Sequence, residues 1–180
     1  MEIMALPKLM TEEAAMEIAE KRGNFLGRLL LKEKRITLKL MYLESKEIIY
    51  NMTYQSLPLM KKSRLSSGGP QAQKIRMMVE GTRCTPAFLD EPLNTVKVQV
   101  DEEDQLQNTA FPEQKLIEEG KYLARRMVRR QSGRNVCMEA ESIHSVYRPY
   151  YVAFYGDMVE GTRVRYLPIP ADGNEIRRTF

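Results

Sequence analysis

The sequence has few of the residues that build metal centres, disulfide scaffolds and membrane spans. It contains one histidine, His144, and two cysteines, Cys84 and Cys137, with no CxxC pair. Zinc sites need about four such ligands at close spacing, and disulfide-rich domains use more cysteines. No apolar run approaches the roughly 18 residues of a membrane span, and residues 1–10 lack the apolar stretch of a secretory signal. We therefore predict no metal, no cofactor, no membrane span, two free thiols and a cytoplasmic location.

What the chain does have is the composition of an ordinary folded protein. Its 180 residues are 43% hydrophobic and 29% charged, with a formal net charge of +4. This composition is too apolar for a disordered chain, so we expect a hydrophobic core. The mild positive charge favours an anionic partner, and the excess of basic over acidic residues lies entirely in residues 1–92.

A six-residue motif occurs twice and indicates an internal duplication. Met-Val-Glu-Gly-Thr-Arg stands at residues 78–83 and again at residues 158–163. Each copy follows an aromatic strand candidate with tyrosines four positions apart, at residues 49–54 and 150–155. The recurrence of both features in the same order favours a repeated structural unit.

One amphipathic helix is predicted in each half. The first covers residues 11–23, with Thr11 as its N-cap, and the second covers residues 112–131. Period-two alternation over residues 36–42 predicts a strand after the first helix, and residues 135–146 form a less regular strand candidate after the second. The order helix, strand, strand, strand therefore occurs twice.

The predicted fold is α+β, an internal duplication of a unit in which a helix packs on a three-stranded antiparallel sheet. This element order resembles the small helix-on-sheet modules of cystatin-like or PepSY-like type, which host many functions. We place the first repeat at residues 1–100 and the second at residues 111–180, joined by an acidic connector at residues 101–110. The sequence leaves open whether the halves form one domain or two, and whether Glu80 and Glu160 meet in space.

A long basic loop is the strongest candidate site. Residues 57–76 contain no acidic residue and surround a tip rich in glycine and serine. The predicted binding residues are Lys61, Lys62, Arg64, Lys74 and Arg76. Such a loop could close on phosphate groups or on an acidic protein surface, or it could be a solvated insertion without a role. It lacks the glycine and lysine spacing of a P-loop.

Other side chains have both a functional and a structural interpretation. A second basic cluster could follow a nucleic-acid backbone, or it could simply oppose the negative end of a helix dipole; its members are Arg125, Arg126, Arg129, Arg130 and Arg134. The tyrosine-rich stretch around Arg148 could stack bases or fill the core. His144 has no recognisable catalytic partner, and Cys84 is reactive only if the neighbouring Arg83 lowers its pKa.

The leading functional hypothesis is a non-catalytic binding or regulatory protein that contacts a macromolecular partner through the loop at residues 57–76. The first alternative is a nucleic-acid-binding protein, and the second is a small enzyme with an unrecognised site. Because the sequence contains no catalytic arrangement, an enzyme is the less favoured class. The sequence leaves open whether the partner is an acidic protein or nucleic acid, and whether the chain forms a homo-oligomer.

Overall fold

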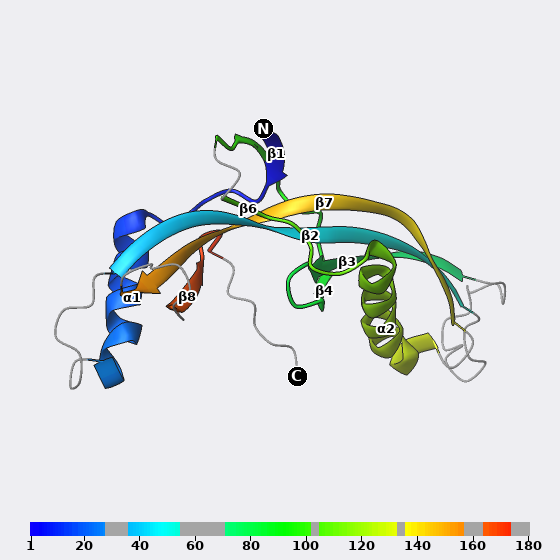
Figure 1. Cartoon of the computed structure of the whole chain (residues 1–180). Coiled ribbons are helices and arrows are strands. Elements are labelled where there is room, and N and C mark those ends of the chain that lie inside the picture. Colours follow the sequence, from blue (N-terminus) through cyan, green and yellow to red (C-terminus); the bar gives the residue numbers. More distant parts are fainter. Residues whose placement is uncertain (28–35, 55–70, 102–104, 133–135, 157–163, 174–180) are drawn as a thin grey trace. The chain divides into compact units, whose positions relative to one another are not determined.

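The computed structural model describes residues 1–27, 36–54, 71–101, 105–132, 136–156 and 164–173. Within these ranges the chain forms eight strands and two helices (Figure 1). The helices are α1 (Glu12–Gly27) and α2 (Glu113–Ser132). The strands are β1 (Glu2–Ala5), β2 (Ile36–Tyr54), β3 (Gln71–Glu80), β4 (Thr85–Leu89), β5 (Val96–Gln99), β6 (Leu106–Gln107), β7 (Val136–Tyr155) and β8 (Arg165–Pro170). Neither described helix is long and apolar enough to cross a membrane.

The eight strands belong to one mixed sheet. Its main path has the order β4-β3-β2-β7-β1-β5, with β6 beside β2 and β8 beside β7. The pairs β2–β3, β3–β4, β7–β8 and β1–β5 are antiparallel, whereas β1–β7 and β2–β6 are parallel. The predicted duplication of a helix on a three-stranded antiparallel sheet is therefore wrong.

The difference arises because two long strands each carry what we predicted as two short ones. Residues 36–42 and 49–54 belong to the single 19-residue strand β2. Residues 136–146 and 150–155 belong to β7, which has 20 residues. The polar residues 44–47 contain no glycine or proline that would end β2. The polar composition of these residues does not produce a turn, because Glu44 and Lys46 form hydrogen bonds with other residues of the folded chain.

The chain divides into two compact units, and β2 and β7 contribute residues to both. The first unit comprises Met1–Leu43, Asn94–Gln107 and Tyr147–Phe180. The second comprises Glu44–Leu93 and Asn108–Val146. Each unit is therefore assembled from segments that are distant in the sequence.

In the first unit, α1 packs on the sheet through its small side chains. The Thr11 hydroxyl oxygen accepts a hydrogen bond from the Ala14 backbone N at 3.3 Å, as expected for an N-cap. Ala15 and Ala19 are fully buried in a cluster with residues of β7, β8 and the segment that follows β8. The buried members from these segments are Tyr151, Ala153, Ile169 and Ala171.

In the second unit, α2 packs on residues of β2, β3 and β7. Leu116 and Ala124 are fully buried, and the Tyr50 hydroxyl donates a hydrogen bond to the Ile117 carbonyl at 2.6 Å. The strand residues of this cluster are Ile48, Tyr50, Met52, Ile75, Met77, Val79 and Met138. Met127 follows the buried Ala124 by about one turn but is 43% exposed, so the buried side of α2 does not extend to it.

The structure describes only the first copy of the repeated motif, at residues 78–83. Residues 78–80 end β3, and residues 81–84 form the turn to β4. The second copy, residues 158–163, lies outside the described residues, as does Glu160. The equivalence of the two copies therefore stays a prediction.

Candidate functional site

The five residues predicted to form a basic loop fall into two groups. Lys61, Lys62 and Arg64 lie outside the described residues, and their role in binding stays a prediction. Lys74 and Arg76 lie in strand β3 rather than in a loop. The predicted loop therefore includes the first six residues of a strand.

Lys74 and Arg76 already have carboxylate partners in the second unit. Lys74 Nζ lies 2.7 Å from Glu141 Oε1 in β7, and Arg76 Nε lies 3.5 Å from Glu47 Oε1 in β2. Partly exposed pairs of this kind contribute about 0–1 kcal/mol to stability. Cations that are engaged in this way are less available to a phosphate than unpaired ones.

The polar cluster around Glu44 has no counterpart in our sequence analysis. The Glu44 carboxylate accepts hydrogen bonds from Lys46 Nζ at 2.9 Å, Ser145 Oγ at 2.7 Å and the Thr109 backbone N at 3.0 Å. Lys46 Nζ also donates to Ser145 Oγ at 2.8 Å. The only sequence signal is Lys46 two positions from Glu44, since Thr109 and Ser145 come from distant segments.

A serine, a lysine and a carboxylate in contact are the parts of several nucleophilic sites. In this cluster the Ser145 hydroxyl donates its hydrogen bond to Glu44 rather than to Lys46. Lys46 Nζ donates to both Glu44 and Ser145, so in this geometry it does not accept the Ser145 proton. Burial alone would raise the pKa of Glu44, but the hydrogen bonds from Lys46, Ser145 and Thr109 together hold that pKa below its ordinary value. A carboxylate held in its charged form is a weak general base.

We expect Glu44 to make the free energy of unfolding depend on acid pH. Because its pKa is lower in the folded than in the unfolded chain, its stabilisation is fully present above the unfolded pKa, about 4.3, and is lost as the pH falls through the folded pKa. Urea unfolding at several pH values below about 5 should therefore show a shallower decline for Glu44→Gln than for wild type. Parallel curves for the two proteins would contradict this assignment.

Cys84 and His144 do not form a reactive site with other described residues. Cys84 is half-buried in the turn after β3, where burial, followed by the nearby Glu119, raises the pKa of its thiol. This is opposite to the shift that activates a cysteine. His144 is exposed in β7. The described residues also hold no group of three or more His, Cys, Asp or Glu side chains able to bind a metal.

The tyrosine-rich stretch of β7 belongs largely to the core. Tyr147, Tyr150 and Tyr151 are all buried. Arg148 is buried as well, and its Nε and Nη2 lie 2.7 and 3.0 Å from the two carboxylate oxygens of Asp172. Buried rings cannot stack on bases from solution, so the core interpretation of these residues is correct.

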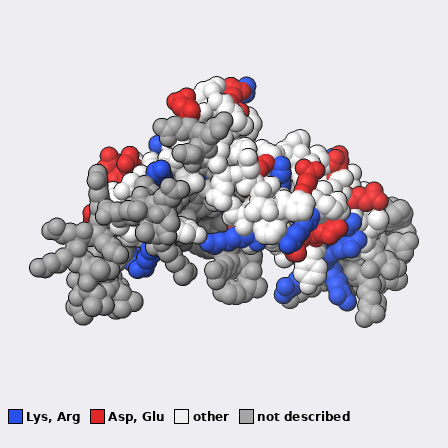
Figure 2. All heavy atoms as spheres, in the orientation of Figure 1, with Lys and Arg blue, Asp and Glu red and all other residues white. Residues whose placement is uncertain are grey.

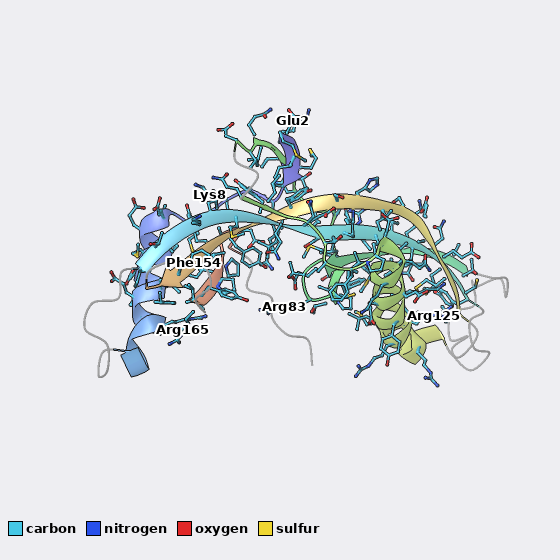
Figure 3. All side chains as sticks on the ribbon, in the orientation of Figure 1. Glu2, Lys8, Arg83, Arg125, Phe154 and Arg165 are labelled. Carbon is cyan, nitrogen blue, oxygen red and sulfur yellow. The ribbon has the colours of Figure 1, made fainter. Side chains whose placement is uncertain are left out.

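The solvent-facing side of α2 carries several exposed cations. Arg125, Arg126 and Arg129 are exposed, and none of them makes an ion pair with another described residue. Lysine and arginine side chains gather around α2 in Figure 2, and Arg125, labelled in Figure 3, projects from this helix. Together with the half-buried Lys121, we call these residues the basic face of α2. The side chain of Arg130 and all of Arg134 lie outside the described residues.

The basic face is not explained by helix stability. Lys121, Arg125 and Arg129 follow one another at four-residue spacing, and like charges at this spacing destabilise a helix by about 0.2–0.5 kcal/mol per pair. Favourable interaction with the helix dipole is confined to the last turn, and α2 ends at Ser132. The dipole therefore accounts for Arg129 but not for Arg125 or Arg126.

Comparisons with known proteins do not assign a role to this face. No family model, curated protein or solved structure matches the chain. A function is therefore inferred from the charges and exposure of the described side chains alone.

The first unit has an open hollow of the opposite charge. It lies on α1 and is lined by Glu12, Glu13, Met16, Glu17 and Glu20. One of these carboxylates is paired, since Lys21 Nζ lies 2.5 Å from Glu17 Oε1. An open, mainly acidic helix surface differs from the enclosed and mostly apolar pockets that bind small substrates. This hollow therefore does not favour an enzyme.

Proposed function

We propose that the protein is a non-catalytic binding protein that contacts nucleic acid through the basic face of α2. The observation that carries the proposal is the exposed ladder of like charges, Lys121, Arg125 and Arg129, with Arg126 beside it and no carboxylate partner for the arginines among the described residues. The ladder destabilises the isolated helix, whereas phosphates placed against it would relieve the repulsion and release counterions. The net charge of +4 favours the same class of partner.

Nucleic acid fits the basic face better than an acidic protein does. The centres of protein interfaces are depleted in charged residues, but this face presents three arginines within five positions. The planar guanidinium group matches the phosphate group and can bind it through two hydrogen bonds. Regular spacing along one helix also suits a partner whose charges are themselves regularly spaced.

We keep Lys61, Lys62 and Arg64 in the proposal as a second contact with the same partner. They carry charge of the same sign and no acidic residue stands among them in the sequence. Lys74 and Arg76 contribute less, because Glu141 and Glu47 already neutralise them. The leading hypothesis of contact through a basic loop is thus retained for Lys61, Lys62 and Arg64, but the principal contact surface is now α2.

Changing Arg125, Arg126 and Arg129 together to glutamine should weaken the binding of a short fluorescent oligonucleotide and reduce its salt dependence. Each lost phosphate contact lowers the slope of log K against log salt by about 0.7–0.9, so the triple variant should lose about two to three units of slope. Fluorescence anisotropy at several salt concentrations measures both quantities. Glutamine keeps a high helix propensity, so α2 should remain folded.

The matched control changes Lys21, Arg22 and Arg165 to glutamine, because this removes the same charge from exposed positions of the first unit. We expect its slope to stay close to that of wild type. A parallel variant with Lys61, Lys62 and Arg64 changed to glutamine measures the second contact. Wild type that binds neither single-stranded nor duplex oligonucleotide at low salt would disprove the proposal and favour a protein partner.

A further inference from the structure

An exposed tyrosine lies within the basic face of α2. Tyr122 is 66% exposed, and it makes no hydrogen bond or ring contact with another described residue. Arg125 and Arg126 follow it by three and four positions. Side chains at these spacings are neighbours on a helix surface, about 5–6 Å apart at Cβ. Tyr122 therefore shares a face of α2 with Arg125 and Arg126.

The position of Tyr122 is not explained by the stability of the fold. The ring leaves most of its apolar surface in water, and tyrosine has a lower helix propensity than leucine, lysine or arginine. Tyr50 in the same unit shows the contrast, since it is buried and its hydroxyl donates to the Ile117 carbonyl. The helix α1 provides a second contrast to the exposed tyrosine of α2. The hollow on the solvent side of α1 is lined by glutamates and one methionine, and no aromatic residue among those described lines it.

We infer that Tyr122 stacks on an unpaired base and that the ligand of the basic face is single-stranded nucleic acid. This inference rests on the proposed function and specifies its ligand. An aromatic ring can stack on any base whose face is free, whereas in a duplex these faces are covered by neighbouring base pairs. A nucleotide whose base lies on the Tyr122 ring would bring its phosphate group within reach of Arg125 and Arg126. The ring and the arginines thus form one subsite for base and backbone.

The test compares three labelled probes of about 12 nucleotides: a single strand, an abasic single strand of the same length and a duplex. The variants are Tyr122→Leu, which removes the ring, and Tyr122→Phe, which keeps it. Tyr122→Leu should bind the single strand about 5- to 150-fold more weakly, the usual effect of losing one stacked base. Its affinity for the abasic strand and the duplex should stay within about twofold of wild type, because neither offers a free base. Tyr122→Phe should bind all three probes nearly as wild type does.

Two outcomes overturn the inference without affecting the proposed function. Equal losses on all three probes would show that Tyr122 supports the helix rather than a base. Unchanged affinity for the single strand would show that the ring does not stack. In either case, a loss of salt dependence in the variant with Arg125, Arg126 and Arg129 changed would still support nucleic-acid binding. If wild type binds none of the probes at low salt, both proposals are wrong.

Discussion

Replacing Asp172 with asparagine should lower the free energy of unfolding by about 3–5 kcal/mol, the range seen when one partner of a buried ion pair is removed. The Arg148 and Asp172 side chains are 2% and 1% exposed, and two hydrogen bonds of 2.7 and 3.0 Å join them within the first unit. Asparagine keeps the shape but removes the charge that balances the buried guanidinium. Denaturant unfolding followed by circular dichroism measures the change.

The exposed pair between Lys97 and Glu2 provides the control for this prediction. Its atoms are 2.9 Å apart, but the two side chains are 69% and 50% exposed. Glu2→Gln should therefore change the free energy of unfolding by less than about 1 kcal/mol. The double change Arg148→Met with Asp172→Leu should recover part of the loss, because it removes both buried charges. If Asp172→Asn were as mild as Glu2→Gln, the buried pair would not be a determinant of stability.

Gly81→Ala should destabilise the second unit by about 1–3 kcal/mol or more, because the site has no room for a methyl group. A Cβ at this position would approach the Glu44 carbonyl oxygen and the Thr109 side chain to well under 3.0 Å. The Glu44 oxygen cannot move away easily, since it accepts a hydrogen bond from the Gly81 N at 3.0 Å, and the Gly81 carbonyl accepts one from Ala110 at 2.9 Å. Thermal and denaturant unfolding would show the loss.

The neighbouring variant Thr82→Ala separates this steric effect from a general sensitivity of the turn. Thr82 is half-buried in this turn, and its hydroxyl contacts the carboxylate of Glu80, the last residue of β3. Its removal should cost about 1 kcal/mol. A Gly81→Ala protein as stable as wild type would show that the backbone of β2 moves to make room for the methyl group. Steric crowding would then not explain why the first copy of the repeated motif has a glycine at this position.

Local patterns predicted that both helices exist and where each begins, but α1 continues four residues beyond its predicted end at Gly23. The predicted ranges 11–23 and 112–131 correspond to α1 and α2, because helical hydrogen bonds, caps and apolar periodicity all lie within a few residues of one another. The strands were harder, since nothing local distinguishes one 19-residue strand from two shorter strands with a polar turn. Residues 44–47 remain in β2 because Glu44 and Lys46 find partners from segments that are far away in the sequence.

The sequence by itself determined that the chain has the composition of a folded protein, that two segments form helices, and that the second of these helices carries a group of arginines. Only the tertiary structure decided which cations are available to a partner. The sequence predicts Lys74 and Arg76 to be loop cations, but in the folded chain they pair with Glu141 in β7 and Glu47 in β2. Arg125 and Arg126 have no such carboxylate neighbour among the described residues. The availability of a charge depends on carboxylates brought close by folding, and for residues on different strands the sequence separation does not determine that distance.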